Sequence, residues 1–465
     1  MKKLLAIVLA LVMLLSLAAC GGDPVQSTEP EGSADETAAV SESDVTVPEG
    51  TVEVVWWTNY GASNVAYIQQ IIDQFNASQD QYFVTIERQG SAGELKAKLR
   101  STNAENLPAM FSGTPATTCF YAESDFTACF QDFVDADSED WTADIYDVIR
   151  TSFCDTEGNM WGAPFGVSCT GLWINEDILA AAGYTTADIT SFAKLCDIAT
   201  DIVRGGHATY GLAFIKDGAF LNNMLALEGV DALDMDNGFS GDATKSLYNE
   251  GETLAVLTEA MEDYAELYNN NIAVPFGTDM NGEILPSFAA GNIAMFFGTN
   301  SYAGKLLGYE TTMNYTFISV PGLTENALYA GVVPSGTGNY ISSGASEAEQ
   351  QGAYEFIKFL AKAENQSFWC QSTGYVPYTS SCADYEDYKN WSAENFPAAQ
   401  GLLDAMLETD SNVKLPYTSV ATDIQSANVM LFEQIYADPQ GDVQGYIEEA
   451  AETVTEALEI AALSK

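Results

Sequence analysis

Three residues near the start of the folded part combine aromatic faces with a polar amide, a combination suited to binding carbohydrate. Trp57, Asn59 and Tyr60 lie at the end of a β-rich stretch, residues 52–57. Aromatic rings pack against the apolar faces of sugars while a few placed polar groups bond the hydroxyls, which is the general form of a small-molecule site. Side chains alternate along a strand. We therefore expect Trp57 to face a ligand and Trp56 to be buried in the core.

The chain offers little for catalysis. Its single histidine, His207, lies in the turn-like sequence Arg204-Gly205-Gly206-His207, and the sequence contains no Gly-x-Ser-x-Gly motif. Without a second histidine, neither a metal centre nor a catalytic triad is expected. The 66 Asp and Glu residues could still supply a carboxylate pair, so a secreted glycoside hydrolase is the alternative of another class. We expect a protein that is not an enzyme and holds no cofactor or metal.

The elements predicted around the aromatic residues form an α/β fold. The β stretch at residues 52–57 is followed by apolar residues at helical spacing over 65–75 and by a second β stretch at 82–86. This order predicts a parallel sheet covered by helices, with ligands at the carboxyl ends of its strands. Residues 293–298 are apolar throughout, as in a buried parallel strand. The part from residue 51 onward exceeds the roughly 250–300 residues of a single core, so two lobes are expected.

The first twenty residues have the features of an exported chain. Lys2 and Lys3 precede an apolar run over residues 4–17, a pattern typical of a secretory signal peptide. The run is shorter than the roughly 18 residues that a membrane-spanning helix needs. Leu17-Ala18-Ala19-Cys20-Gly21 resembles a bacterial lipobox, which implies that residues 1–19 are removed and that Cys20 is lipidated. A structural role for Cys20 is the alternative, but it would not explain the small residues before it.

The segment that follows, residues 20–50, is expected to be a disordered acidic linker, because after Cys20 it has no Lys, Arg or aromatic residue. The whole chain is acidic as well, with 17 Lys and Arg against 66 Asp and Glu and a formal net charge of −49. That charge disfavours nucleic acid as a partner. The seven cysteines beyond Cys20 lack zinc-ligand spacing, and their pairing is left open.

Four segments, in order along the chain, carry a resemblance to a known family. They match its opening strand and helix, its crossover into the second lobe, its F-x-x-G-x-x-A-M segment, and its late helix with a T-G-Y-x-P turn. These are residues 54–75, 164–177, 287–295 and 353–377. In this order, after a lipobox, they resemble the extracellular solute-binding lipoproteins of ABC importers (family 1), in the group of maltose- and glycerol-phosphate-binding proteins.

The resemblance implies two α/β lobes that close on a solute about a hinge, so that a permease senses the bound state. The implied chain crossovers lie near residues 164–168, 295–299 and 331–338. The implied lobes are the following: residues 51–164 with 299–331 form the first, and residues 165–298 with 332–465 form the second.

Residues at strand ends and crossovers are the candidate ligand-binding positions. Ser168 and Thr170 lie at the first implied crossover, although turn hydrogen bonding is an equal alternative. Gly331 lacks a side chain and could let backbone approach a ligand. Tyr375 matches the tyrosine of the family's turn. The full set is Trp57, Asn59, Tyr60, Ser168, Thr170, Thr299, Asn300, Gly331 and Tyr375, with Trp161, Tyr121, Glu94 and Tyr417 as weaker candidates.

The expected ligand is a neutral sugar or oligosaccharide. The glycerol-phosphate branch of the family implies an arginine in the region 415–422, and this chain has none there. Arginine holds phosphate through paired charge-assisted hydrogen bonds, and nothing in that segment replaces them. We expect a monomeric binding subunit, anchored to the outer face of the membrane by lipid on Cys20, that delivers its solute to permease subunits. Alternatives are a binder of glycerol phosphate or another polar solute, and a surface adhesion lipoprotein.

Overall fold

The computed structural model describes residues 46–463. The predicted leader, Cys20 and the linker up to residue 45 lie outside the described residues. Within residues 46–463, no helix has the combination of length and apolar character that crossing a membrane requires.

The first sheet contains the predicted β-α-β unit. Strands β1 (Val52–Thr58), β2 (Tyr82–Arg88) and β3 (Met110–Gly113) are parallel, with Val54 beside Val84 and Trp56 beside Met110. Strand β10 (Ser335–Ser342) runs antiparallel to β3 and also pairs with β4 (Thr127–Ala128) and β5 (Gly162–Ser168). The strand order is β2-β1-β3-β10-β4, with β5 on β10.

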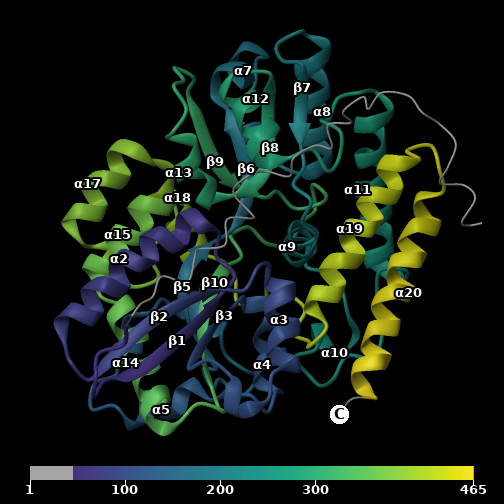
Figure 1. The fold of residues 1–465 in the computed structure, drawn as a ribbon. Coiled ribbons are helices and arrows are strands. Elements are labelled where there is room, and N and C mark those ends of the chain that lie inside the picture. The colour runs from purple at the N-terminus through teal and green to yellow at the C-terminus, as the bar shows by residue number, and fades with distance from the viewer. Residues whose placement is uncertain (1–45, 464–465) are drawn as a thin grey trace, which may run out of the picture. The chain divides into compact units, whose positions relative to one another are not determined.

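Helices cover this sheet, as the β-α-β pattern predicted. Helix α2 (Ala62–Ser78) buries Val65, Ile68, Ile71, Ile72 and Phe75, so the helical spacing read from the sequence is confirmed. Helix α14 (Glu347–Leu360) packs on β1, and Figure 1 shows both α2 and α14 beside the first sheet. Helix α3 (Ala92–Ser101) begins with a capping box, in which Ser91 and Glu94 each bond the other's backbone amide. Helix α15 (Ala363–Thr373) packs against α2.

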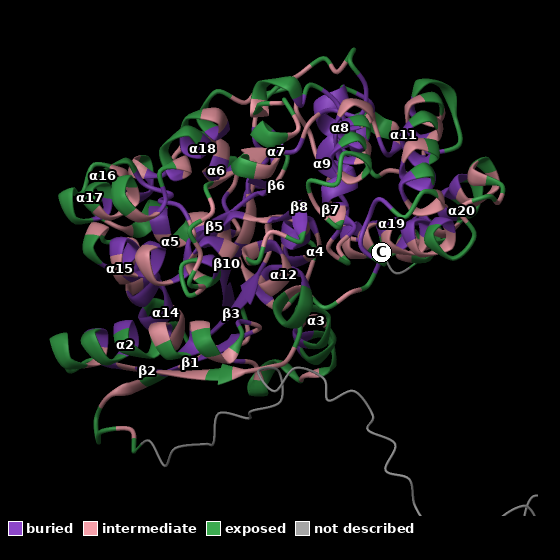
Figure 2. Ribbon diagram, turned by 90° about the horizontal axis from the view of Figure 1, so that it is seen from above, coloured by how far each residue is buried: buried purple, intermediate pink, exposed green. Residues whose placement is uncertain are grey.

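The second sheet has four strands in the order β7-β8-β6-β9. They are β6 (Thr170–Asn175), β7 (Tyr210–Ala213), β8 (Ile293–Thr299) and β9 (Tyr315–Ser319). Strand β8 is buried along its apolar length and runs parallel to β7, but it is antiparallel to β6. In Figure 2 this strand and the centre of the first sheet are mainly buried, whereas the helices around them carry the exposed residues.

The helices of the second lobe include α8 (Phe192–Arg204), α9 (Ala219–Glu228), α11 (Gly251–Asn269), α19 (Ala421–Ala437) and α20 (Val443–Ala462). Helices α19 and α20 pack against each other and against α11. The remaining α-helices of residues 46–463, from both lobes, are α4 (Thr118–Ala122), α5 (Phe130–Ala136), α6 (Asp147–Thr151), α7 (Glu176–Ala181), α10 (Asp234–Asn237), α12 (Leu285–Ala289), α13 (Ala303–Leu306), α16 (Ser380–Ala383), α17 (Glu386–Asn395) and α18 (Ala398–Leu407).

Strand pairing and helix packing correct the expected division of the chain: most of β5, all of β10 and the helices α14 and α15 belong to the first lobe and not to the second, and β9 belongs to the second. Strand β9 was expected in the first lobe, but it pairs with β6, and Phe317 packs on Trp173 with ring centroids 5.0 Å apart. Strand β10 was expected in the second lobe, but it lies in the first sheet, where Tyr340 stacks on Phe111 at 5.7 Å. Strand β5 also belongs to the first sheet, so the first crossover is at Cys169. These pairings join segments far apart in sequence, which local periodicity does not reveal.

Candidate functional site

Strand ends and crossovers from both sheets define the candidate site. The parallel strands β1 and β3 end at Thr58 and Gly113, and the parallel strands β7 and β8 end at Ala213 and Thr299. The chain passes between the sheets at Cys169, next to the Thr170–Thr299 pair. Ligands of α/β folds lie at the carboxyl ends of such strands. The loops that follow these four strands are therefore the place to look for ligand-binding groups.

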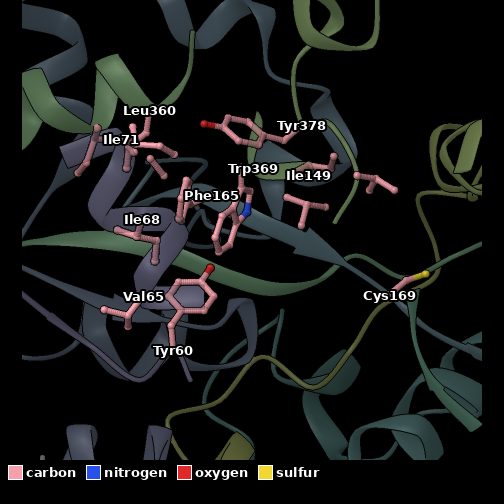
Figure 3. Close-up of a cluster of buried hydrophobic side chains, with 14 of the residues drawn as sticks. Tyr60, Val65, Ile68, Ile71, Ile149, Phe165, Cys169, Leu360, Trp369 and Tyr378 are labelled. Atoms are coloured by element: carbon pink, nitrogen blue, oxygen red, sulfur yellow. The ribbon is translucent and has the colours of Figure 1, made fainter. Parts of the chain in front are cut away.

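Four aromatic side chains form one wall beside the first crossover; Tyr60, Phe165 and Trp369 belong to a buried core and are 4%, 1% and 0% exposed, and only Tyr375 is half-buried. Trp369 stacks on Phe165 with ring centroids 4.7 Å apart and on Tyr375 at 5.5 Å. Tyr60 meets Trp369 edge-on at 5.4 Å, and Figure 3 shows Tyr60, Phe165 and Trp369 gathered beside Tyr378. The hydroxyl of Tyr60 is buried beside Thr337 and the Gly166 backbone, but it makes no well-formed hydrogen bond to a described residue. Burial and the nearby Tyr375 raise its pKa well above the ordinary value.

Trp57 lies apart from this wall. The residue is 7% exposed and packs in a small core with Leu95 and Leu99 of α3, with Lys98 Nζ 3.7 Å from the ring centroid. Trp56 is fully buried on the other face, where its Nε1 donates to Ser112 Oγ at 3.0 Å. Both tryptophans therefore serve the first lobe's packing, and the predicted ligand contact of Trp57 has no support from its position. Asn59 follows β1 and is half-buried.

The predicted polar residues Ser168, Thr299 and Asn300 hydrogen-bond to other parts of the chain. Asn300 is fully buried: its Oδ1 accepts from the Cys169 amide at 2.7 Å, and its Nδ2 donates to the Gly374 carbonyl at 2.9 Å. Ser168 Oγ lies 3.3 Å from Ser335 Oγ, and Thr299 Oγ1 lies 2.6 Å from Ser301 Oγ. These side chains tie the connecting segments together. The bonds of Asn300 also hold the residue before Tyr375.

Gly331 lies against Thr409, just after helix α18. Its φ is +143°, and a Cβ there would meet Thr409, whose hydroxyl accepts from the Val332 amide at 2.8 Å. Two of the weaker candidates are also structural. Glu94 caps α3, and Tyr121 packs on Tyr340 with ring centroids 4.7 Å apart.

Sequence reasoning missed an acidic residue in the loop after β7. Asp217 Oδ1 accepts from the Ala219 amide at 2.8 Å; within residues 46–463 this is its only hydrogen bond, and it forms no ion pair. The adjacent Lys216 pairs with Glu433 at 2.5 Å instead. Burial raises the pKa of Asp217. The available signal was its place shortly after the apolar residues 212–215, where β7 ends.

Tyr302, also missed, joins Asp217 to the aromatic wall. It follows β8 in the short 3-10 helix η6 (Asn300–Tyr302). Burial, with the charge of Asp217 as the next cause, raises the pKa of Tyr302 to about 12. Burial, with Tyr302 as the next cause, raises the pKa of Tyr375 to about 12. The charge of Asp217 therefore acts on Tyr302, and Tyr302 in turn on Tyr375, whose ring lies 6.5 Å from that of Tyr60.

The lobes also meet at the start of α19. Lys96 on α3 donates to Thr422 Oγ1 on α19 at 3.0 Å, and its Nζ lies 4.3 Å from the Phe120 ring centroid. Burial lowers the pKa of Lys96, and the nearby Asp423 opposes that effect. The 3-10 helix η2 (Pro115–Thr117), after β3, packs on α19 as well. Lys96 of the first lobe therefore contacts Thr422, in the segment 415–422 that contains no arginine.

A separate cavity of about 310 Å³ lies between Trp161 and Tyr417. Phe239 is also in its lining, and Trp161 Nε1 donates to Asp155 Oδ2 at 2.9 Å. Burial raises the pKa of Tyr417. None of the lining residues belongs to the group around Tyr60 and Asp217, so these two weaker candidates share a different site.

Two sheets joined by chain crossovers, with polar and aromatic groups where they meet, define the class of two-lobed binding proteins. The fold agrees with the sugar-binding protein MalE from Xanthomonas citri (TM-score 0.71, 16% identity, covering 89% of this chain and 98% of that one). It agrees equally with UgpB from Mycobacterium tuberculosis in complex with glycerophosphocholine (TM-score 0.70, 17% identity, 89% and 100%). The predicted two-lobed α/β fold is confirmed.

Residues 70–398 match the family model described as bacterial extracellular solute-binding protein, and the chain belongs to this family. It is also similar to the sn-glycerol-3-phosphate-binding periplasmic protein UgpB of Agrobacterium fabrum, with 24% identity over 430 residues, 88% of this chain and 93% of that protein. The family resemblance read from the four sequence segments is thereby confirmed, and the chain is a solute-binding protein of an ABC importer and not an enzyme.

Proposed function

We propose that the protein captures a neutral sugar or short oligosaccharide between its lobes and delivers it to the permease of its importer. The observation that carries this proposal is Asp217, whose carboxylate accepts one hydrogen bond, from the Ala219 amide at 2.8 Å, has no cationic partner among residues 46–463, and acts by its charge on Tyr302. A carboxylate accepts hydrogen bonds from sugar hydroxyls, and aromatic faces pack on the sugar ring. The same carboxylate would repel the phosphate of an anionic solute.

A glycerol-phosphate-type solute is the second candidate, because Lys96 lies against Thr422. The name of the Agrobacterium relative points the same way. However, Asp423 already interacts with Lys96, and Lys96 is less easily kept charged because it is desolvated. A lysine also lacks the paired donors with which arginine holds phosphate. The neutral ligand is therefore favoured.

A thermal-shift panel on the exported protein, purified in detergent, tests the ligand class. Binding to the native state by a solute at 100 times its Kd contributes about 2.7 kcal/mol, which is about 3 °C in Tm for a chain of this size. We expect this shift with neutral mono-, di- or trisaccharides and none with sn-glycerol-3-phosphate or glycerophosphocholine. A shift with the phosphate solutes alone would overturn the proposal in favour of the second candidate.

We propose that the protein acts at the outer face of the membrane. The mature chain is a monomer, and lipid on Cys20 anchors it there. Two acyl signals hold a protein at a membrane without a spanning helix. Cells fed a radiolabelled fatty acid should label the wild-type protein and not the Cys20→Ser variant, which should appear in the medium. Equal membrane retention of both proteins would contradict the anchor.

A further inference from the structure

A buried polar network lies behind the Asp217 loop. It joins Asn222 on α9, Tyr248 before α11 and Asn428 on α19, whose residues are 7%, 0% and 0% exposed. Tyr248 donates its hydroxyl hydrogen to Asn428 Oδ1 at 2.8 Å, and its oxygen lies 3.2 Å from Asn222 Oδ1. Asn428 Nδ2 donates to Asn222 Oδ1 at 2.8 Å and to the Gly218 carbonyl at 2.9 Å. The network therefore ends on the residue next to Asp217.

The Gly218 backbone is held against α19 by shape as well as by this hydrogen bond. A Cβ at Gly218 would lie 2.8 Å from the Asn428 Cβ and would collide with the Gln425 carbonyl. Only glycine allows this close approach between the turn and the helix. Asp217 is fixed from the other side by the Ala219 amide. Its carboxylate is thus oriented by the start of α9 and by the middle of α19 together.

Stability alone does not require such a network. Replacing buried hydrogen-bonding partners by apolar groups of the same shape is often nearly neutral, whereas a fully bonded network specifies one geometry. Helix α19 also carries Thr422, which receives the hydrogen bond of Lys96 from the first lobe. One helix therefore connects the position of the Asp217 carboxylate to the contact between the lobes.

We propose that Asn222, Tyr248 and Asn428 are positioning residues that hold the Asp217–Gly218 turn on α19 in the geometry required for ligand capture. This inference rests on the proposed function, because it treats Asp217 as a ligand-binding group. The three residues act through the turn and do not touch the ligand themselves. Their loss should therefore weaken binding more than the accompanying loss of stability explains.

Two variants test this inference by calorimetric titration well below Tm, with the solute that gives the wild-type thermal shift. Tyr248→Phe removes one hydroxyl and should raise Kd about 3-fold to 10-fold; Asn428→Leu leaves the Gly218 carbonyl unpaired and should raise it at least 10-fold, since one 1.4 kcal/mol interaction is a factor of ten. The matched control is Tyr354→Phe in the first lobe, whose hydroxyl accepts from Trp141 at 3.0 Å and donates to Asp137 at 2.9 Å. This control should lose stability and keep its Kd.

Hydrogen exchange of the ligand-free proteins supplies a readout that does not depend on the solute. The amide of Ala219 should exchange faster in Asn428→Leu than in the wild type, and at the wild-type rate in Tyr354→Phe. Unchanged Kd and unchanged exchange in both network variants would overturn the positioning role while leaving the proposed function intact. If the wild-type protein binds no solute of the panel, the proposed function is overturned. The exchange rate of the Ala219 amide then tests by itself whether the network positions the Asp217–Gly218 turn.

Discussion

Asn300 and Asp217 follow neighbouring strands of the second sheet, yet the two loops use their polar side chains in opposite ways. Both atoms of the Asn300 amide are bonded to backbone, at 2.7 Å and 2.9 Å, inside the crossover region. Asp217 has one backbone hydrogen bond and no cationic partner within residues 46–463. In the loop after β8, the Asn300 side chain is fully used in hydrogen bonds that join separate chain segments. The loop after β7 keeps a charged group that a ligand can satisfy.

The difference arises because a polar side chain next to a chain crossover bonds to the backbone of the crossover. Crossover segments leave one sheet and enter another, so their backbone amides and carbonyls lack the partners that a strand provides. Asn300 supplies those partners for Cys169 and Gly374. The loop after β7 does not contact the crossover in this way, and the carboxylate of Asp217 accepts only one hydrogen bond among residues 46–463. The comparison predicts which substitutions damage the fold and which damage binding.

The largest effect is expected from Asn300→Ala. The change leaves the Cys169 amide and the Gly374 carbonyl buried without partners, and each orphaned group costs about 1–3 kcal/mol. We expect the free energy of unfolding in urea to fall by about 2–4 kcal/mol. The matched control is Asn76→Ala, because Asn76 likewise bonds both backbone groups of one residue, Val84, at 2.8 Å and 3.0 Å. Full stability with lost binding in Asn300→Ala would mean that Asn300 is a ligand residue.

Asp217→Asn should do the reverse. Losing the carboxylate should raise the Kd for the solute at least 10-fold, about 1.4 kcal/mol, because charged hydrogen bonds contribute more than neutral ones. The raised pKa of Asp217 means that its ionisation disfavours the folded state, a penalty that grows as pH rises through that pKa. The variant should therefore be as stable as the wild type, or more so, at pH 7, and the two should converge below about pH 4.

Asp231→Asn is the control for this charge removal. Asp231 also has a pKa raised by burial, but it lies in the loop after α9 and away from the strand ends. Titration calorimetry should give it the wild-type Kd. If both variants lost affinity equally, the effect would belong to net charge and not to the position of Asp217.

How much of this was predictable from sequence depended on how local each signal is. Helix α2 followed from apolar spacing within one segment. The lobes to which β9 and β10 belong could not be predicted in this way, since their partner strands lie far away in sequence. The partners of Asn300 are 131 and 74 residues distant, so its structural role was invisible. Asp217 carries no motif, and only the three-dimensional position of its loop distinguishes it among 66 acidic residues.

A smaller effect is expected from Lys96→Ala, which removes a contact between the lobes without touching either loop. The hydrogen bond to Thr422 and the attraction to Asp423 stabilise only the arrangement in which α3 meets α19. A partly exposed pair of this kind is worth about 0.2–1 kcal/mol, so the Kd should rise about 1.5-fold to 5-fold, chiefly through faster dissociation. Lys98→Ala is the control, because Lys98 bonds Gln89 within the first lobe. Dissociation rates of the solute are measured by stopped flow. Equal rates for Lys96→Ala and Lys98→Ala would contradict a role of the Lys96 contact in holding the lobes together.

The smallest change in stability is expected from Tyr60→Phe. Because the fold should be unaffected, a change in Kd for this variant would report directly on ligand contact at the aromatic wall. The Tyr60 hydroxyl is buried and makes no well-formed hydrogen bond to a described residue, so its removal should alter the free energy of unfolding by less than about 0.5 kcal/mol. The ring contacts with Trp369 and Phe165 remain in phenylalanine. Any rise in Kd would then report a hydrogen bond that the hydroxyl makes only to the ligand. An unchanged Kd would assign Tyr60, like Trp57, to packing, and would leave Asp217, Tyr302 and Tyr375 as the groups that meet the solute.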